Sequence, residues 1–271
     1  MKKVVTIAAA AFGAMASILP SSAAAQISDS WQFEGSIYGY LPTITTKSNL
    51  PNGATSELKF DARTILEHLK MTFMGSLEAQ KGRWGVFTDV IYMDVGAGAA
   101  KTRDFTLGDR VQLPAGVTAS TTMDMKTVIW TLGGSYRVVA SPEGTLDVLA
   151  GARLLDIKIN QGFQLTGNVG PIPIPGRSGS AEIKGNNWDA IIGVKGRLAL
   201  GADGKWFVPY YADVGTGESR VTSQLMGGIG YSFSWGSVIG TWRYLDWDNK
   251  SGKPLQNLNI NGPVMAVAFR W

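Results

Sequence analysis

The single histidine, His68, is the first candidate for catalysis. It lies in the segment FDARTILEHLK, Phe60–Lys70, with Glu67 beside it. A histidine base in a hydrolase needs an acid that orients its ring and a nucleophile or a water molecule that faces it. No serine motif accompanies this pair. We therefore expect His68 to be a solvated or inward-facing residue of a short helix, and we predict no catalytic residue and no enzymatic activity.

Metal and cofactor sites have equally little support in the sequence. One histidine and no cysteine leave only scattered carboxylates as ligands. The glycine-rich pieces Gly96–Gly98 and Gly227–Gly230 lack the lysine and the following helix of a phosphate-binding loop. We expect them to be strand glycines. The segment PIPIPG, Pro171–Gly176, is expected to stiffen an exposed loop, because alternate prolines disfavour helix and ladder pairing alike. No metal and no cofactor is predicted.

Charged residues that alternate with apolar ones form the most informative set. The acids are Glu34, Glu78, Asp89, Asp189 and Asp213, and the bases are Arg137, Arg153, Lys195, Arg197, Arg243 and Arg270. A selective pore shows one sign of charge in excess at its constriction, whereas these acids and bases nearly balance. We predict that they point into a narrow lumen and fill it with ion pairs.

The elements that must position these charges are strands. Ten segments of about 10 to 18 residues alternate apolar and polar residues, as barrel strands do. We predict strands near Trp31–Pro42, Met71–Gln80, Trp84–Val95, Thr121–Val138, Leu146–Asn160, Ile183–Leu200, Trp206–Gly215, Arg220–Phe233, Ser237–Asp248 and Leu258–Trp271. The fold class is therefore all-β, a transmembrane antiparallel up-and-down barrel of about ten strands, with eight or twelve as alternatives.

The connections between these segments differ in length on the two edges. Tight turns rich in Gly, Pro, Asp and Ser are expected at Lys81–Arg83, Ser141–Gly144, Gly201–Gly204 and Ser234–Gly236. Longer connections are expected at Thr43–Lys70, Gly96–Ser120, Gln161–Glu182 and Asn249–Asn257, with Thr216–Ser219 as a short exception. Outer-membrane barrels have this asymmetry, with tight turns in the periplasm and long loops outside.

Alternation alone does not distinguish a soluble barrel or sandwich from a membrane barrel. In Trp188–Leu200, one face carries Trp188, Ile192 and Leu198, and the other carries Asp189, Lys195 and Arg197. A soluble fold would turn the apolar face inward, whereas a membrane barrel turns it toward lipid. Aromatic residues at strand ends favour the membrane. They are Trp31, Trp84, Trp206, Tyr231, Phe233 and Trp271, and they resemble an interfacial girdle.

The beginning of the chain predicts export. Lys2 and Lys3 precede an apolar run that ends at small residues, and Ala23–Ala25 fits a signal peptidase site. We predict a cleaved signal over residues 1–25 and one barrel domain over 26–271, in the outer membrane and in contact with its lipid. Without the two signal lysines the formal charge is about +2, which argues against a nucleic-acid partner. Apolar runs after residue 25 are too short for a membrane-spanning helix.

The last ten residues, GPVMAVAFRW, place large apolar residues at every second position. Met265, Val267, Phe269 and Trp271 share one face, which predicts a lipid-facing strand that ends in an interfacial anchor. Deletion of Trp271, or its replacement by aspartate, is expected to block assembly.

Several segments resemble uncharacterised Gram-negative outer-membrane β-barrel proteins. The segments are LDVLAGARLLD (Leu146–Asp156), YADVGTG (Tyr211–Gly217), GIGYSFSWGSVIGTWRYLDWD (Gly228–Asp248) and FMGSLEAQKGRWGVFTDVIYMDV (Phe73–Val95). The resemblance implies that Met265, Val267, Phe269 and Trp271 are the signal read by the barrel-assembly machinery. The usual last residue in such proteins is Phe, and Trp271 departs from it.

Two further expectations concern local structure. Asp61 is expected to cap a short helix whose stripe of Ile65, Leu66 and Leu69 folds over or into the barrel mouth. Glu34 and Arg270 are expected to form an ion pair across the seam between the first and last strands.

Three functions remain open from the sequence: a structural or surface-interacting barrel with long exposed loops, a passive channel for small solutes, or a lipid- or peptide-processing enzyme. The balanced lumen charges favour the first.

Overall fold

The computed structural model describes residues 27–49, 55–101, 117–169, 172–201 and 203–271. The predicted signal segment, residues 1–25, lies outside them. The elements are β1 (Gln32–Tyr40), β2 (Thr43–Asn49), β3 (Thr55–Phe60), α2 (Ala62–Glu67), β4 (Leu69–Lys81), β5 (Trp84–Lys101), β6 (Val117–Ser141), β7 (Gly144–Val169), β8 (Ile172–Leu200), β9 (Trp206–Gly217), β10 (Ser219–Ser232), β11 (Gly236–Asn249) and β12 (Leu255–Arg270). Among these residues, no helix is long and apolar enough to cross a membrane.

Ten strands close into an antiparallel barrel. The order around it is β1-β4-β5-β6-β7-β8-β9-β10-β11-β12, and β12 pairs with β1 to close the sheet. Phe33 and Trp271 extend this seam, because each backbone N–H donates to the carbonyl oxygen of the other at 2.9 and 3.1 Å. The predicted count of ten strands is confirmed.

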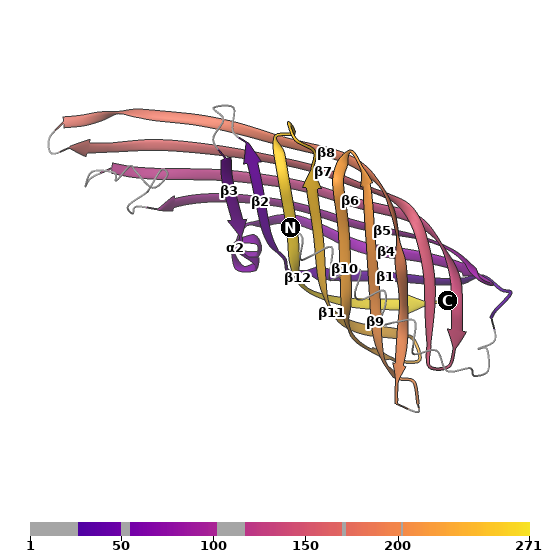
Figure 1. The fold of residues 1–271 in the computed structure, drawn as a ribbon. Coiled ribbons are helices and arrows are strands. Elements are labelled where there is room, and N and C mark those ends of the chain that lie inside the picture. The colour runs from indigo at the N-terminus through magenta and orange to yellow at the C-terminus, as the bar shows by residue number, and fades with distance from the viewer. Residues whose placement is uncertain (1–26, 50–54, 102–116, 170–171, 202) are drawn as a thin grey trace.

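The two ends of the barrel differ as the connection lengths predicted. At the turn end lie the four tight turns, where Gly82, Gly201 and Gly204 have φ between 59° and 76°. These left-handed conformations favour glycine because it has no Cβ. At the opposite, loop end, β5 to β8 continue far past the other strands as a curved sheet (Figure 1).

Strand pairing reaches much farther into the loop end than the sequence indicated. The predicted loop Gln161–Glu182 is mostly hairpin, since β7 and β8 pair as far as Val169 and Ile172. The expectation that PIPIPG leaves the ladder is wrong, because Pro173 lies in β8 opposite Asn168. Proline is tolerated there because β9 pairs with β8 only from Asp189 onward, so this part of β8 is a sheet edge.

The first long connection is also structured. β2 continues the line of β1 along β12, and β3 pairs with β2. Gly262 faces the junction between β1 and β2, where a Cβ would overlap the backbone of Leu41 and Pro42. α2 follows and leads into β4, and Figure 1 shows α2 beside β2 and β3 near the loop end.

Large apolar side chains cover the outer wall of the barrel. They include Phe33, Ile37, Phe73, Leu77, Trp84, Val86, Ile192, Leu198, Val214, Leu225, Ile229, Trp242, Met265 and Phe269. The predicted aromatic girdle is present at the turn end, where ring contacts link Trp31, Phe33 and Trp271, and link Trp206, Tyr231, Phe233, Trp235 and Phe269. An apolar wall bordered by aromatic rings is the surface that barrels present to lipid.

Buried apolar side chains fill the lumen at the loop end. This loop-end core includes Ile44, Phe60, Ile65, Met74, Ile91, Met93, Ile129, Leu155, Ile157, Leu245, Trp247, Leu258 and Ile260. It joins residues of β2, β3 and α2 to the inner faces of the barrel strands. The alternating sequence pattern predicted paired charges in the lumen and did not indicate this core.

The predicted capped helix is confirmed, with one correction. The Asp61 carboxylate accepts from the Thr64 N–H at 2.8 Å, and this hydrogen bond holds the pKa of Asp61 below its usual value. Ile65 is buried in the loop-end core, and Leu69 packs against that core. Leu66 is 51% exposed, so it does not belong to the buried stripe.

Candidate functional site

The lumen is the candidate functional site, because eight of the eleven charges expected to point inward line its cavity. The other three, Arg153, Asp189 and Asp213, are buried. From the turn end toward the loop end, it contains an open cavity, a network of buried polar groups and then the loop-end core.

The central network joins six strands across the barrel. It consists of Tyr38 (β1), Asp89 (β5), Arg153 (β7), Asp213 (β9), Gln224 (β10) and Arg243 (β11). Arg153 binds both carboxylate oxygens of Asp213, with 2.9 Å from Nη1 to Oδ1, and both side chains are fully buried. Arg243 donates to Asp89 at 2.7 Å and to the Tyr38 hydroxyl at 3.1 Å. The Tyr38 hydroxyl in turn donates to Asp89 at 2.7 Å.

Gln224 connects the two arginines. Its Oε1 accepts from Arg153 at 3.0 Å and from Arg243 at 3.1 Å. Buried charges require this degree of pairing, because an uncompensated charge in a low-dielectric interior is very costly. The network therefore crosslinks the barrel wall and occupies the middle of the lumen.

Nearer the turn end, three more ion pairs lie around the cavity. Lys195 binds Glu78 at 2.6 Å across the lumen, with its ammonium 4.6 Å from the Phe87 ring centroid. Arg137 binds Asp147 through two bonds of 2.8 and 3.0 Å. Asp147 was not among the predicted lumen charges, although it lies in the same strand as Arg153 and six residues away, which places both on one face.

The third of these pairs is the predicted seam pair, Glu34 with Arg270. The two residues are directly opposite in register, and Arg270 Nε is 2.5 Å from Glu34 Oε2. Their side chains are 35% and 41% exposed, so this pair is not buried. The large penalty expected for a buried lone charge does not apply here.

We expect a double-mutant cycle of Glu34→Ala and Arg270→Ala to give a coupling energy of about 0.5–1 kcal/mol, because water screens the pair. The cycle is measured by urea unfolding in detergent or lipid vesicles. Additive effects of the two changes would show that the pair contributes nothing to barrel closure.

Asp189 lies apart from the other lumen charges. It accepts from the backbone N–H and the hydroxyl of Ser219 at 2.8 and 2.7 Å. Ser219 in turn belongs to a buried polar cluster with Asn187 and Asn249 near the loop end. Asp189 is therefore held by hydrogen bonds to Ser219.

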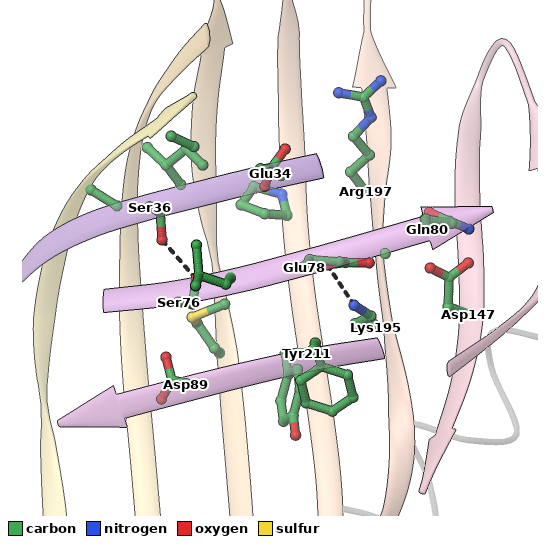
Figure 2. A pocket seen from close by; sticks show the side chains of 18 of the residues that line it. Glu34, Ser36, Ser76, Glu78, Gln80, Asp89, Asp147, Lys195, Arg197 and Tyr211 are labelled. Carbon is green, nitrogen blue, oxygen red and sulfur yellow. Dashed lines mark hydrogen bonds and ion pairs between the residues drawn. The ribbon is translucent and has the colours of Figure 1, made fainter. Parts of the chain in front are cut away.

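A cavity of about 740 Å³ occupies the lumen on the turn side of the central network. We call it the turn-side chamber. Glu34, Glu78, Asp89, Asp147, Lys195 and Arg197 line it, and Figure 2 shows these side chains extending into it from the surrounding strands. Its lining also includes Trp31 and Trp271 at the turn end. The chamber therefore opens toward the turn end, and the central network forms its floor.

His68 lies outside this site. It forms the C-cap of α2, and its Nδ1 is 2.9 Å from the carbonyl oxygen of Thr64. Among the residues that the structure describes, no group of three or more His, Asp or Glu side chains is arranged to hold a metal ion.

The four residues of the predicted assembly signal lie at the seam. Met265, Val267 and Phe269 alternate on the outer side of β12, where Met265 and Phe269 are exposed, and Trp271 follows in the aromatic girdle. This placement is what a lipid-facing closing strand requires. Recognition by an assembly machinery stays a prediction.

The closed ten-stranded barrel with an apolar outer wall has the fold of outer-membrane β-barrel proteins. The chain matches no protein-family model and no curated protein sequence. Solved structures of outer-membrane barrels are similar in fold. The outer-membrane protease OmpT of Escherichia coli aligns with a TM-score of 0.50 at 9% identity, covering 91% of this chain and 98% of that one.

Two other barrels align less well. The translocator domain of the autotransporter NalP from Neisseria meningitidis gives a TM-score of 0.37 at 14% identity, covering 98% of this chain and 96% of that one. The attachment invasion locus protein Ail of Yersinia pestis gives 0.32 at 10% identity, covering 89% and 98%. These similarities concern the fold, and they assign no activity to this chain.

Proposed function

We propose that this protein is an integral outer-membrane barrel with a closed lumen, which holds the extended sheet of β5 to β8 on the outer side of the membrane for a structural or surface-interaction role. The observation that carries this proposal is the loop-end core. A water-filled pore requires a polar path along its whole length. Here fully buried apolar side chains such as Ile129, Leu155 and Trp247 lie in the lumen beyond the central network.

The apolar outer wall supports the membrane location, and the tight turns support an orientation with the turn end in the periplasm. We further propose that residues 1–25 are removed as a signal peptide and that outer-membrane lipid surrounds the barrel. Heat-modifiable migration and recovery in the outer-membrane fraction test the location. Recovery as a soluble periplasmic protein would exclude the membrane proposal.

Planar-bilayer recordings of the purified protein test closure. We expect no stable conductance steps from the native chain. A variant in which a short connector replaces residues 43–68 is expected to show measurable conductance, because it loses Ile44, Phe60 and Ile65 from the loop-end core.

The matched control shortens the hairpin of β7 and β8 beyond Gln161 and Ala181, since it alters a loop-end segment but keeps those core residues. Stable channels formed by the native chain would contradict the closed-barrel proposal and would favour a passive small-solute channel. Proteolysis of peptides or hydrolysis of lipid by the pure protein would favour the enzyme alternative.

A further inference from the structure

Arg197 on β8 differs from the other basic residues of the lumen in its partners. The other five cations each bind a carboxylate, in the pairs Arg137–Asp147, Arg153–Asp213, Lys195–Glu78, Arg243–Asp89 and Arg270–Glu34. Within the described part of the chain, Arg197 forms no ion pair, and its guanidinium carbon lies 5.6 Å from the ring centroid of Phe207. One positive charge in the turn-side chamber is therefore uncompensated.

The surroundings of Arg197 increase the attraction for an anion. Two positive charges, Arg270 and Arg137, and one negative charge, Glu34, act on Arg197, and all three line the same chamber. The carboxylates that pair with the two arginines, Asp147 and Glu34, are already engaged. In Figure 2 Arg197 stands beside Glu34, and no interaction links it to the residues drawn. A free guanidinium presents a planar fork of donors that matches a carboxylate.

The rest of the chamber indicates what kind of molecule would carry that carboxylate. Apolar and aromatic groups form much of the wall, among them Phe87, Phe207, Tyr211, Ile239 and Ala266. The volume of about 740 Å³ lies within the range of roughly 300–1,000 Å³ found for small-molecule sites, which combine apolar walls with a few polar groups.

The floor of the chamber limits the direction of entry. The central network and the loop-end core block the lumen beyond Asp89 and Arg243. A ligand would therefore enter from the turn end, past Trp31 and Trp271.

We propose that the turn-side chamber binds a small amphipathic carboxylate. Its carboxylate binds the Arg197 guanidinium, and its apolar body lies against Phe207 and the deeper walls. The single uncompensated charge favours a monoanion over a dianion. This site does not depend on the surface role proposed above, and it requires no open pore.

Calorimetric titration of the full-length mature protein in lipid nanodiscs tests this site. The probe is 3-phenylpropionate, its neutral analogue is 3-phenylpropanamide, and empty nanodiscs give the blank. We expect saturable binding of the carboxylate. We expect the amide to bind at least tenfold more weakly, since a hydrogen bond to an ionised group is roughly twice as strong as one between neutral groups.

The Arg197→Gln variant is expected to bind 3-phenylpropionate at least tenfold more weakly than the native chain does. Arg63→Gln is the matched control, because Arg63 is an exposed arginine of α2 at the opposite end of the barrel, and it should bind as the native chain does. Heat-modifiable migration verifies folding of both variants.

Three results would overturn the proposal: no binding of 3-phenylpropionate, equal binding of the amide, or unchanged binding in folded Arg197→Gln. The comparison of acid and amide uses only the native chain, so it tests the site even if the variant does not fold. A conducting barrel that binds the probe would contradict the closed lumen but leave this site intact.

Discussion

Replacing Arg153 with methionine is expected to lower the free energy of unfolding by about 3–5 kcal/mol. Arg153 and Asp213 are both fully buried, and the guanidinium binds both carboxylate oxygens. Methionine fills a similar volume but removes the charge, so Asp213 would remain as a lone buried anion. Gln224 would also lose one of its two donors.

The double change Arg153→Met with Asp213→Leu should be much less destabilising than the single change, because no buried charge is then left alone. Arg220→Met is the control. Arg220 also pairs with an aspartate, Asp248, but the arginine is 53% exposed, so we expect a loss of less than about 1 kcal/mol.

These free energies are measured by urea titration in lipid vesicles, with the heat-modifiable band shift as the signal for folding. If Arg153→Met and Arg220→Met lost the same stability, the central network would not be a principal support of the barrel.

The second large effect is expected for Trp247→Ala, which should lower the free energy of unfolding by about 3–5 kcal/mol. Trp247 is 0% exposed and is the largest fully buried side chain of the loop-end core. Alanine would leave a cavity between β11 and the facing residues. The same variant should also let ions pass through the loop-end core, so that it conducts in planar bilayers, whereas we expect no stable conductance from the native chain.

Trp242 provides the matched control on the same strand. It points to the opposite face and is 57% exposed toward the outer wall. Trp242→Ala should lower the free energy of unfolding by clearly less, because it leaves no cavity in a packed core. Trp247→Phe should retain most of the stability, since the Trp247 N–H has no hydrogen-bond partner in the described structure and phenylalanine removes that unpaired donor. A cost for Trp242→Ala as large as that for Trp247→Ala would contradict a packed core.

The sequence by itself determined the wall of this barrel. The two-residue period separated lipid-facing from inward residues, as in Trp188 and Asp189, and turn residues such as Gly82 marked the tight end. The sequence also determined the pairing between the first and last strands, because their antiparallel arrangement places Glu34 and Arg270 at the same height along the barrel axis. These features depend on local chemistry and on a period that a linear chain displays.

Only the tertiary structure decided what fills the lumen. Arg153 and Asp213 are 60 residues apart in the sequence. Barrel curvature and strand tilt place residues of non-neighbouring strands face to face, and they therefore decide which acid each inward-facing base contacts. The loop-end core could not be predicted from the sequence for a related reason. Ile157 and Ile159 resemble any strand residues in the chain, and an apolar side chain can face lipid or a packed interior equally well. These isoleucines face a packed interior because β2, β3 and α2 place Ile44, Phe60 and Ile65 against them. This packing buries them inside the barrel and excludes water.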